Sequence, residues 1–323
     1  MSRIHEALKK AEQERAGGTV TEVIAPQTEA PAAVSEWAAT PESVSPPPAA
    51  EQLQPVPDTQ PFLRFDDLRA RCARPEWHLD PNVNVFFNSA LSSQGAEQFR
   101  TLRSRLYQLR NDQPLRTLLV TSSVPGEGKT LVVANLAQAI VRQPDRRALI
   151  IDADLRRARL HTTLGAPAAP GLTDYLRGEA DEMQIIQHGQ DGTLCLIPGG
   201  SEVTNPSELL SNGRLKKLLD RVAPVFDWVI LDSPPCLPVA DAAILAALCD
   251  GVLLVVRAGV TPGPMVQRAC QEMQGRYIAG VVLNAVQPRH LYGSYYYYDT
   301  YGYQDNPESK GGQRNESRAA AAN

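Results

Sequence analysis

The chain has 323 residues, 43% of them hydrophobic, which is enough for one large or two ordinary domains with a buried core. A net charge of −4 and a pI of about 5.8 argue against a nucleic-acid-binding protein. There is no run of roughly 18 apolar residues, no signal-peptide pattern and no CxxC pair among the five cysteines, so we expect a cytoplasmic protein with reduced cysteines and no direct membrane span.

The N-terminal part of the chain predicts two segments outside any packed domain. Residues 1–16 fit a short amphipathic helix, because Ser2 can cap it and Ile4 and Leu8 begin an apolar face. Whether this helix is solvated or docks on a partner stays open. Residues 17–61 are rich in Pro, Ala and Glu and contain no Lys or Arg, which predicts a disordered acidic linker.

Residues 62–288 predict an α/β domain. An amphipathic helix over 93–109 comes first, and short apolar runs then alternate with helical segments. Runs this continuous in apolar residues are typical of strands covered on both faces, so we expect a doubly wound, mostly parallel sheet. The predicted strands are Thr117–Thr121, Ala148–Asp152, Leu194–Ile197, Trp228–Leu231, Val252–Val256 and Val281–Leu283, and the predicted helices are Lys129–Val141, Pro206–Val222, Val239–Leu248 and Pro262–Met273.

A phosphate-binding loop follows the first predicted strand and opens a helix. The sequence TSSVPGEGKT over residues 121–130 matches GxxxxGK[ST], except that Ser123 stands at the first glycine. The glycines let backbone N–H groups point at phosphate, Lys129 can reach the β and γ phosphates, and Thr130 can offer its hydroxyl to Mg²⁺. We therefore expect binding of ATP and Mg²⁺. The predicted nucleotide-binding residues are Pro125, Gly126, Glu127, Gly128, Lys129, Thr130 and Leu131.

Three aspartates stand at the ends of predicted strands. Asp152 and Asp154 are two residues apart, so their carboxylates project from the same side of an extended chain. Asp232 follows four apolar residues, as in a Walker B motif. One such aspartate alone is more often the cap of a turn or helix. Because the carboxyl ends of parallel strands share one edge of a sheet, three of them beside a P-loop favour a Mg²⁺ site.

After residue 288 the chain becomes polar and carries a cluster of tyrosines. Seven of the ten tyrosines fall within residues 292–303, and consecutive side chains cannot all face one core. A sticky low-complexity tail would explain the cluster, but the P-loop favours a tail that the protein itself phosphorylates. The predicted phosphorylation sites, in a flexible tail over 289–323, are Tyr292, Tyr295, Tyr296, Tyr297, Tyr298, Tyr301 and Tyr303.

In combination, these motifs resemble those of the bacterial protein-tyrosine kinases, or BY-kinases. The run DADLR at 152–156 is similar to their extra Walker A′ motif, and DSPP at 232–235 followed by VADA at 239–242 is similar to their Walker B region. The runs PGG at 198–200 and NPSELL at 205–210 look like further family motifs. The N-terminal residues look like those of the soluble branch that serves exopolysaccharide or capsule biosynthesis.

The resemblance implies a P-loop NTPase fold of the MinD/ParA-like type and a protein-tyrosine autokinase that uses ATP and Mg²⁺. We expect Asp152 to accept the proton of the attacking phenol. Arg156 is either an electrostatic helper or a surface arginine at the start of a helix. The residues for which the resemblance implies catalytic roles are Lys129, Asp152, Asp154 and Asp232, with Thr130, Asp154 and Asp232 around the metal.

The resemblance also extends to assembly. Glu97, Arg100 and Arg103 form the ExxRxxR pattern that the family uses for subunit contact, although this spacing also suits a solvated salt-bridge face. It implies a homo-oligomeric ring in which one subunit's tail enters a neighbour's site. The implied partners are a membrane polysaccharide co-polymerase or adaptor and a protein tyrosine phosphatase. We therefore expect recruitment to the inner face of the cell membrane and regulation of polysaccharide polymerisation and export.

Two other functions stay open. A switch ATPase of the MinD/ParA type would hydrolyse ATP without modifying a protein. That group carries a second lysine early in the P-loop, where this chain has Val124. The other alternative is a nucleotide-binding regulatory scaffold without kinase activity, because motifs report sites and not rates.

Overall fold

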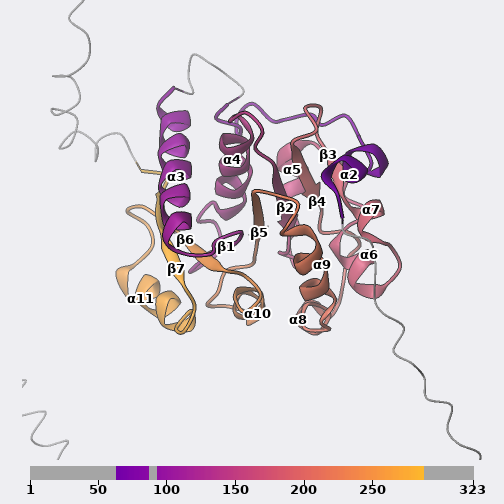
Figure 1. The fold of residues 1–323 in the computed structure, drawn as a ribbon. Coiled ribbons are helices and arrows are strands. Elements are labelled where there is room, and N and C mark those ends of the chain that lie inside the picture. The colour runs from indigo at the N-terminus through magenta and orange to yellow at the C-terminus, as the bar shows by residue number, and fades with distance from the viewer. Residues whose placement is uncertain (1–62, 87–92, 287–323) are drawn as a thin grey trace, which may run out of the picture. The chain divides into compact units, whose positions relative to one another are not determined.

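The computed structural model describes residues 63–86 and 93–286, which form a seven-stranded sheet with helices on both faces (Figure 1). The strands are β1 (Thr117–Ser122), β2 (Ala148–Asp152), β3 (Gln187–His188), β4 (Leu194–Ile197), β5 (Trp228–Asp232), β6 (Gly251–Arg257) and β7 (Ile278–Asn284). Their order across the sheet is β3-β4-β2-β5-β1-β6-β7, and all neighbours run parallel except β3 and β4. The predicted doubly wound, mostly parallel sheet is confirmed.

Helices enclose the sheet from both sides. They are α2 (Phe65–Arg71), α3 (Ser93–Asp112), α4 (Lys129–Val141), α5 (Leu160–Leu164), α6 (Leu172–Arg177), α7 (Glu182–Ile185), α8 (Pro206–Leu210), α9 (Arg214–Val222), α10 (Asp241–Ala246) and α11 (Gly263–Glu272). Helices α3 and α4 contribute to the core on one face, whereas α9, α10 and α11 contribute to the core on the other (Figure 1).

The alternation of side chains along the strands builds these two hydrophobic cores. In β1, Leu118 and Val120 belong to the core of α3 and α4, whereas Leu119 belongs to the opposite core. Every residue of β1, β2 and β5 is buried, as expected for parallel strands covered on both faces. The central strands therefore lie between the two cores, and because they run parallel their carboxyl ends meet at one edge of the sheet.

The structure differs from the prediction in three segments, the first of which is helix α2 over Phe65–Arg71, where no helix was predicted. The helix expected over 206–222 is split into α8 and α9, because Gly213 between them adopts a left-handed conformation with a φ of 81°. Between β2 and β4 the structure adds β3 and the helices α5, α6 and α7, which sequence analysis left unassigned. These helices have only four to six residues, too few for a hydrophobic period to show.

Several predictions concern residues outside the described ranges. They include the helix over 1–16, the linker over 17–61 and the tail over 289–323 with its seven tyrosines, and all of these stay predictions. Within the ranges that the structure describes, no helix combines the length and the apolar character needed to cross a bilayer. All five cysteines lie in these ranges and are free, and three of them are buried.

Candidate active site

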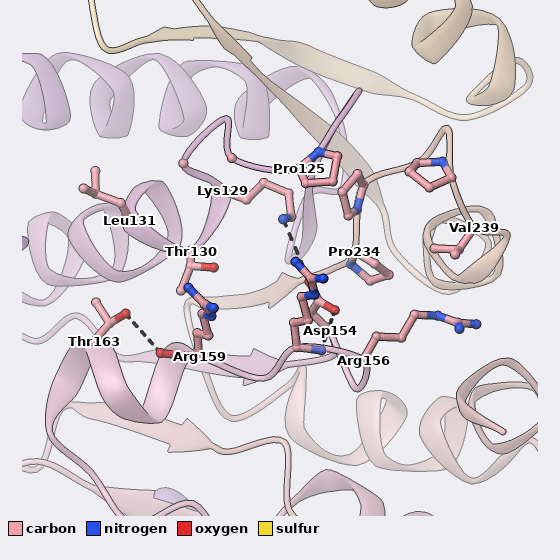
Figure 2. A pocket seen from close by; sticks show the side chains of 15 residues that line it. Pro125, Lys129, Thr130, Leu131, Asp154, Arg156, Arg159, Thr163, Pro234 and Val239 are labelled. Atoms are coloured by element: carbon pink, nitrogen blue, oxygen red, sulfur yellow. Dashed lines mark hydrogen bonds and ion pairs between the residues drawn. The ribbon is translucent and has the colours of Figure 1, made fainter. Parts of the chain in front are cut away.

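The P-loop between β1 and α4 forms one wall of a cavity of about 770 Å³ (Figure 2). Gly126 and Gly128 have φ angles of 84° and 91°, a conformation that L side chains rarely adopt. At Gly128 a Cβ atom would also lie 2.1 Å from Nδ2 of Asn284. Both glycines thus shape the turn that places Lys129 at the start of α4, where the helix N-terminus favours phosphate.

Six of the seven predicted nucleotide-binding residues line this cavity. The lining consists of Pro125, Gly126, Gly128, Lys129, Thr130 and Leu131 from the P-loop and α4, of Asp154, Arg156, Arg157, Arg159 and Thr163 after β2, and of Pro234, Pro235, Pro238 and Val239 after β5. The loops after three neighbouring strands therefore surround one space, as expected at the carboxyl edge of a parallel sheet.

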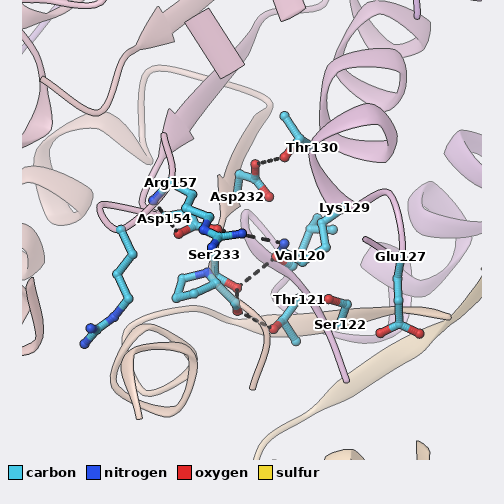
Figure 3. Close-up of polar contacts among 12 residues, drawn as sticks. Val120, Thr121, Ser122, Glu127, Lys129, Thr130, Asp154, Arg157, Asp232 and Ser233 are labelled. Carbon is cyan, nitrogen blue, oxygen red and sulfur yellow. Dashed lines mark hydrogen bonds and ion pairs between the residues drawn. The ribbon is translucent and has the colours of Figure 1, made fainter. Parts of the chain in front are cut away.

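The seventh predicted residue, Glu127, is buried and its carboxylate points away from Lys129 (Figure 3). Its Oε2 accepts a hydrogen bond from the backbone N–H of Val124 at 2.8 Å. Its Oε1 accepts from the backbone N–H of Arg257 at 3.2 Å and from the hydroxyl of Thr261. The Glu127 side chain thus links the P-loop to the end of β6. If Glu127 contacts a nucleotide, its backbone atoms make that contact.

The first two residues of α4 meet the acidic strand ends (Figure 3). The Nζ atom of Lys129 lies 3.9 Å from Oδ2 of Asp154. The hydroxyl of Thr130 donates a hydrogen bond to Oδ2 of Asp232 at 2.6 Å. The structure therefore brings the predicted phosphate-binding lysine and the predicted metal-site residues together.

Asp152 and Asp232 lie directly opposite each other in the register of β2 and β5, and both are buried. The backbone N–H of Leu160 donates to Oδ2 of Asp152 at 2.9 Å. Burial, together with the charge of Asp232, raises the pKa of Asp152 well above its usual value. Burial also raises the pKa of Asp232 to about 6, although Lys129 and the Thr130 hydroxyl oppose the shift.

Each member of this aspartate pair keeps one oxygen without a hydrogen-bond donor in the described part of the chain, namely Oδ1 of Asp152 and Oδ1 of Asp232. Buried carboxylate oxygens without partners are costly unless a cation neutralises them. Hard oxygen ligands suit Mg²⁺, which takes few carboxylates and shares its other positions with water and phosphate oxygens. The residues present therefore fit a nucleotide-bound Mg²⁺ close to Thr130 and Asp232.

The two aspartates after β2 occupy different environments. Asp154 lines the cavity, whereas Asp152 is 0% exposed and is absent from the lining. Burial raises the pKa of Asp154, and the charge of Lys129 and the backbone N–H of Arg157 partly offset this effect. Asp154 is therefore the carboxylate that a molecule entering the cavity can contact.

Arg156, Ser207 and Asp241 form a polar cluster beside the cavity. Nε and Nη2 of Arg156 donate to the two carboxylate oxygens of Asp241 at 2.7 and 3.2 Å, and the hydroxyl of Ser207 donates to Oδ1 of Asp241 at 2.5 Å. Burial alone would raise the pKa of Asp241, but these hydrogen bonds hold it below its usual value. The cluster joins DADLR, NPSELL and VADA, and no local spacing in the sequence reveals that these motifs meet.

The residues of the ExxRxxR pattern do not share one environment. Glu97 and Arg100 form an exposed ion pair on α3. In contrast, Nη1 of Arg103 donates to the backbone carbonyl of Ala139 in α4 at 2.6 Å. Arg103 thus helps to hold α3 on α4, which leaves Glu97 and Arg100 as the exposed members of the pattern.

Comparisons with known proteins agree with this geometry. Residues 116–261 match the AAA domain family. The chain is 33% identical over 219 residues to the tyrosine-protein kinase YwqD of Bacillus subtilis, which covers 67% of this chain and 92% of YwqD. It is 33% identical over 253 residues to the tyrosine-protein kinase etk of Escherichia coli K12, which covers 75% of this chain and 35% of etk.

A solved structure shows the same likeness. The kinase domain of the Escherichia coli tyrosine kinase ETK is similar with a TM-score of 0.58 and 36% identity, over 60% of this chain and 76% of that chain. The chain spans 26% to 35% of the length of the longer curated relatives but nearly the whole length of YwqD. With its P-loop and three strand-end aspartates at one edge of the sheet, the chain belongs to the family of bacterial tyrosine-protein kinases.

Proposed function

We propose that this chain is an ATP-dependent protein-tyrosine autokinase whose substrates are the tyrosines of residues 292–303. The observation that carries the proposal is the convergence of Lys129 and Thr130 with the strand-end aspartates on one cavity. Such an arrangement suits phosphoryl transfer, in which positioning and neutralisation of charge matter more than a strong base.

In the proposed reaction, the phenol oxygen of a tail tyrosine forms a bond to the γ-phosphorus of ATP. The bond between the γ-phosphorus and the bridging oxygen breaks, and ADP leaves with that oxygen. Lys129 binds the β and γ phosphates, and the P-loop glycines orient backbone N–H groups toward them. A Mg²⁺ ion near Thr130 and Asp232 would neutralise negative charge on the phosphates.

The phenol must also lose its proton. A tyrosine has a reference pKa of roughly 10, so a carboxylate within hydrogen-bond reach can accept the proton as transfer proceeds. The sequence predicts Asp152 as this proton acceptor, but the cavity lining favours Asp154 for the role. We expect Asp154→Asn to lower the transfer rate by about 100-fold or more while ATP affinity is kept. Asp152→Asn should instead change the affinity for Mg²⁺.

The proposal extends to assembly and regulation. Residues 62–288 would form the kinase domain, and Glu97 and Arg100 would contact a neighbour in a ring. Each phosphotyrosine adds about −1.5 to −2 charges, so a multiply phosphorylated tail should leave the acidic site and weaken the ring. A phosphatase would reset the tail. A membrane polysaccharide co-polymerase or adaptor would recruit the ring to the inner face of the membrane, where it regulates polysaccharide polymerisation and export.

The kinase activity is tested by incubating the full chain with ATP and Mg²⁺, and with the adaptor if one is required, followed by mass spectrometry of the tail. Phosphate is expected on residues 292–303 and should be lost in Lys129→Met. A matched control is Lys216→Met, because Lys216 is exposed on α9 and pairs only with Asp220 among the described residues.

Other outcomes would support other functions. ATP consumption with an unmodified tail would support a switch ATPase, and nucleotide binding without either reaction would support a regulatory scaffold. The assembly cycle is tested separately by measuring oligomer mass before and after ATP treatment. A ring that persists after full phosphorylation would contradict the proposed dispersal.

A further inference from the structure

A second cavity, of about 420 Å³, lies at the edge of the sheet opposite the P-loop. It contains Leu194, where β4 begins, whereas the P-loop follows the end of the parallel strand β1. The two cavities share no lining residue, and nothing in the proposed kinase function uses the second one. Sites for small molecules have volumes of ~300 to 1,000 Å³, so the second cavity is large enough for such a ligand.

Helix α4 lines both cavities. Lys129, its first residue, belongs to the P-loop cavity, whereas Gln138 and Val141 near its end belong to the second cavity. At a rise of about 1.5 Å per residue, Lys129 and Gln138 are separated by roughly 14 Å along the helix. The second cavity is therefore a separate space at the far end of the helix that begins at the P-loop.

A buried carboxamide without a protein partner lines the second cavity. Gln138 is 7% exposed, yet its side chain forms no hydrogen bond with the residues that the structure describes. A carboxamide offers an acceptor oxygen and an NH₂ donor group, and burial of both without partners is unfavourable. Gln138 is thus suited to a ligand that presents a donor and an acceptor side by side.

The surface around this carboxamide is apolar and preformed. Nε1 of Trp77 donates to Oε1 of Gln187 at 3.3 Å, and Nε2 of Gln187 donates to the carbonyl of Pro167 at 2.9 Å, so the indole ring is held in one orientation. The other apolar lining residues are Leu79, Val141 and Leu194. A flat heterocyclic ring can pack against such a surface, and aromatic side chains stack well on nucleobases.

Two charged side chains complete the lining. Arg142 and Asp191 are both exposed, and neither forms an ion pair within the described part of the chain. The guanidinium of Arg142 lies over the ring of Phe86 at 4.7 Å, and its Nη2 donates to the carbonyl of Phe86 at 3.2 Å, which orients the group. A guanidinium is suited to phosphate, and a carboxylate is suited to the hydroxyls of a ribose.

We propose that the second cavity is a binding site for adenosine 5′-monophosphate (AMP), separate from the P-loop. The adenine ring packs against Trp77, and its amino group and the adjacent ring nitrogen pair with the donor and the acceptor of Gln138. The ribose hydroxyls donate to Asp191, and the phosphate accepts from Arg142. One guanidinium beside one carboxylate favours a single phosphate group over the triphosphate of ATP.

Isothermal titration calorimetry with AMP tests the site without any turnover. All titrations use the full chain carrying Lys129→Met, because this change weakens the P-loop for phosphate and lies outside the second cavity. We expect one equivalent of AMP to bind, and Gln138→Leu to raise its Kd about tenfold. The matched control is Gln267→Leu, at an exposed position of α11 outside both cavities, which should leave the Kd unchanged.

Exposed positions and altered ligands give tests that do not depend on a substitution in the core. Arg142→Gln should raise the Kd of AMP about tenfold and leave the Kd of adenosine unchanged. Asp191→Asn should raise the Kd of both ligands about threefold. Guanosine monophosphate should bind about tenfold more weakly than AMP, because guanine presents two acceptors where adenine presents a donor and an acceptor.

Three results would each overturn the proposal: no binding of AMP to the chain with Lys129→Met, equal affinities for AMP and adenosine, or an unchanged Kd in a folded Gln138→Leu variant. Circular dichroism checks that this variant is folded. If it is not, Arg142→Gln and Asp191→Asn decide, and an unchanged Kd in both rejects the site. None of these measurements reads phosphorylation, so an unphosphorylated tail would contradict the proposed kinase function and leave this site standing.

Discussion

The P-loop and the aspartate pair lie at the same edge of the sheet, yet they bury carboxylates in opposite ways. Glu127 receives three hydrogen bonds from its own chain, whereas Asp152 and Asp232 each keep one oxygen without a donor in the described residues. An unsatisfied buried carboxylate destabilises a fold, so it persists where a ligand satisfies it. Glu127 therefore stabilises the structure of the site, whereas Asp152 and Asp232 are suited to a bound cation.

The largest effect on stability is expected at the satisfied carboxylate. Glu127→Ala removes the acceptor for Val124, Arg257 and Thr261, so the free energy of unfolding should fall by about 3 kcal/mol. Chemical denaturation measures the change. Glu272→Ala is the matched control, because Glu272 is exposed at the end of α11 and should cost less than ~0.5 kcal/mol. Equal losses in the two variants would show that Glu127 does not brace the loop.

Substitution in the pair of Asp152 and Asp232 should have the opposite effect on the free energy of unfolding. At pH 7 and without Mg²⁺, Asp232→Asn removes a buried charge next to Asp152 and should raise the free energy of unfolding by about 2 kcal/mol. The melting temperature should then rise by roughly 4–8 °C. The same variant should lose the extra stability that ATP analogue and Mg²⁺ confer on the parent chain. Destabilisation without Mg²⁺ would contradict this reading of the pair.

The dependence of stability on pH sharpens the same comparison. The pKa of Asp232 is about 6 in the folded protein, whereas its ordinary value, which we take for the unfolded chain, is 3.8. At pH values between these two numbers, the folded state therefore binds more protons than the unfolded state. The contribution of Asp232 to the free energy of unfolding should therefore fall as pH rises from about 4 to about 6 and then level off. Denaturation without Mg²⁺ at several pH values measures the slope. Asp232→Asn should reduce this slope, and the part that remains is expected from Asp152 and Asp154, whose pKa values are also raised. A slope that does not change would rule out Asp232 as a contributor.

The smallest effects on stability are expected for Arg103 and Arg100, which differ in whether the side chain bonds to a neighbouring helix or lies exposed. Arg103 donates to the backbone of Ala139, so Arg103→Ala should lower the free energy of unfolding by about 1 kcal/mol. Arg100 is exposed and pairs with exposed Glu97, so Arg100→Ala should change it by less than ~0.5 kcal/mol. Oligomer mass should respond to Arg100→Ala if this residue contacts a neighbour. If the two variants have the same free energy of unfolding, Arg103 does not hold α3 on α4 more strongly than Arg100 does.

Much of the fold and part of the site could be predicted from the sequence. The apolar runs and the spacing of VPGEGKT are local patterns, and each follows from backbone chemistry over a few residues. The parallel arrangement then brings strand ends to one edge, so the sequence predicts Asp152, Asp154 and Asp232 near Lys129. The short helices between β2 and β4 were missed because four to six residues carry no readable period.

The amino-acid order by itself determined which residues follow which strand, and hence that a glycine turn, a lysine and three carboxylates share one edge. Only the tertiary structure decided where each side chain points. In the folded chain Glu127 accepts a hydrogen bond from Thr261, and Arg156 forms an ion pair with Asp241. Asp154 lines the cavity, whereas Asp152 does not. These outcomes depend on groups brought together by packing across the sheet, far apart along the chain, and local spacing contains no information about such contacts.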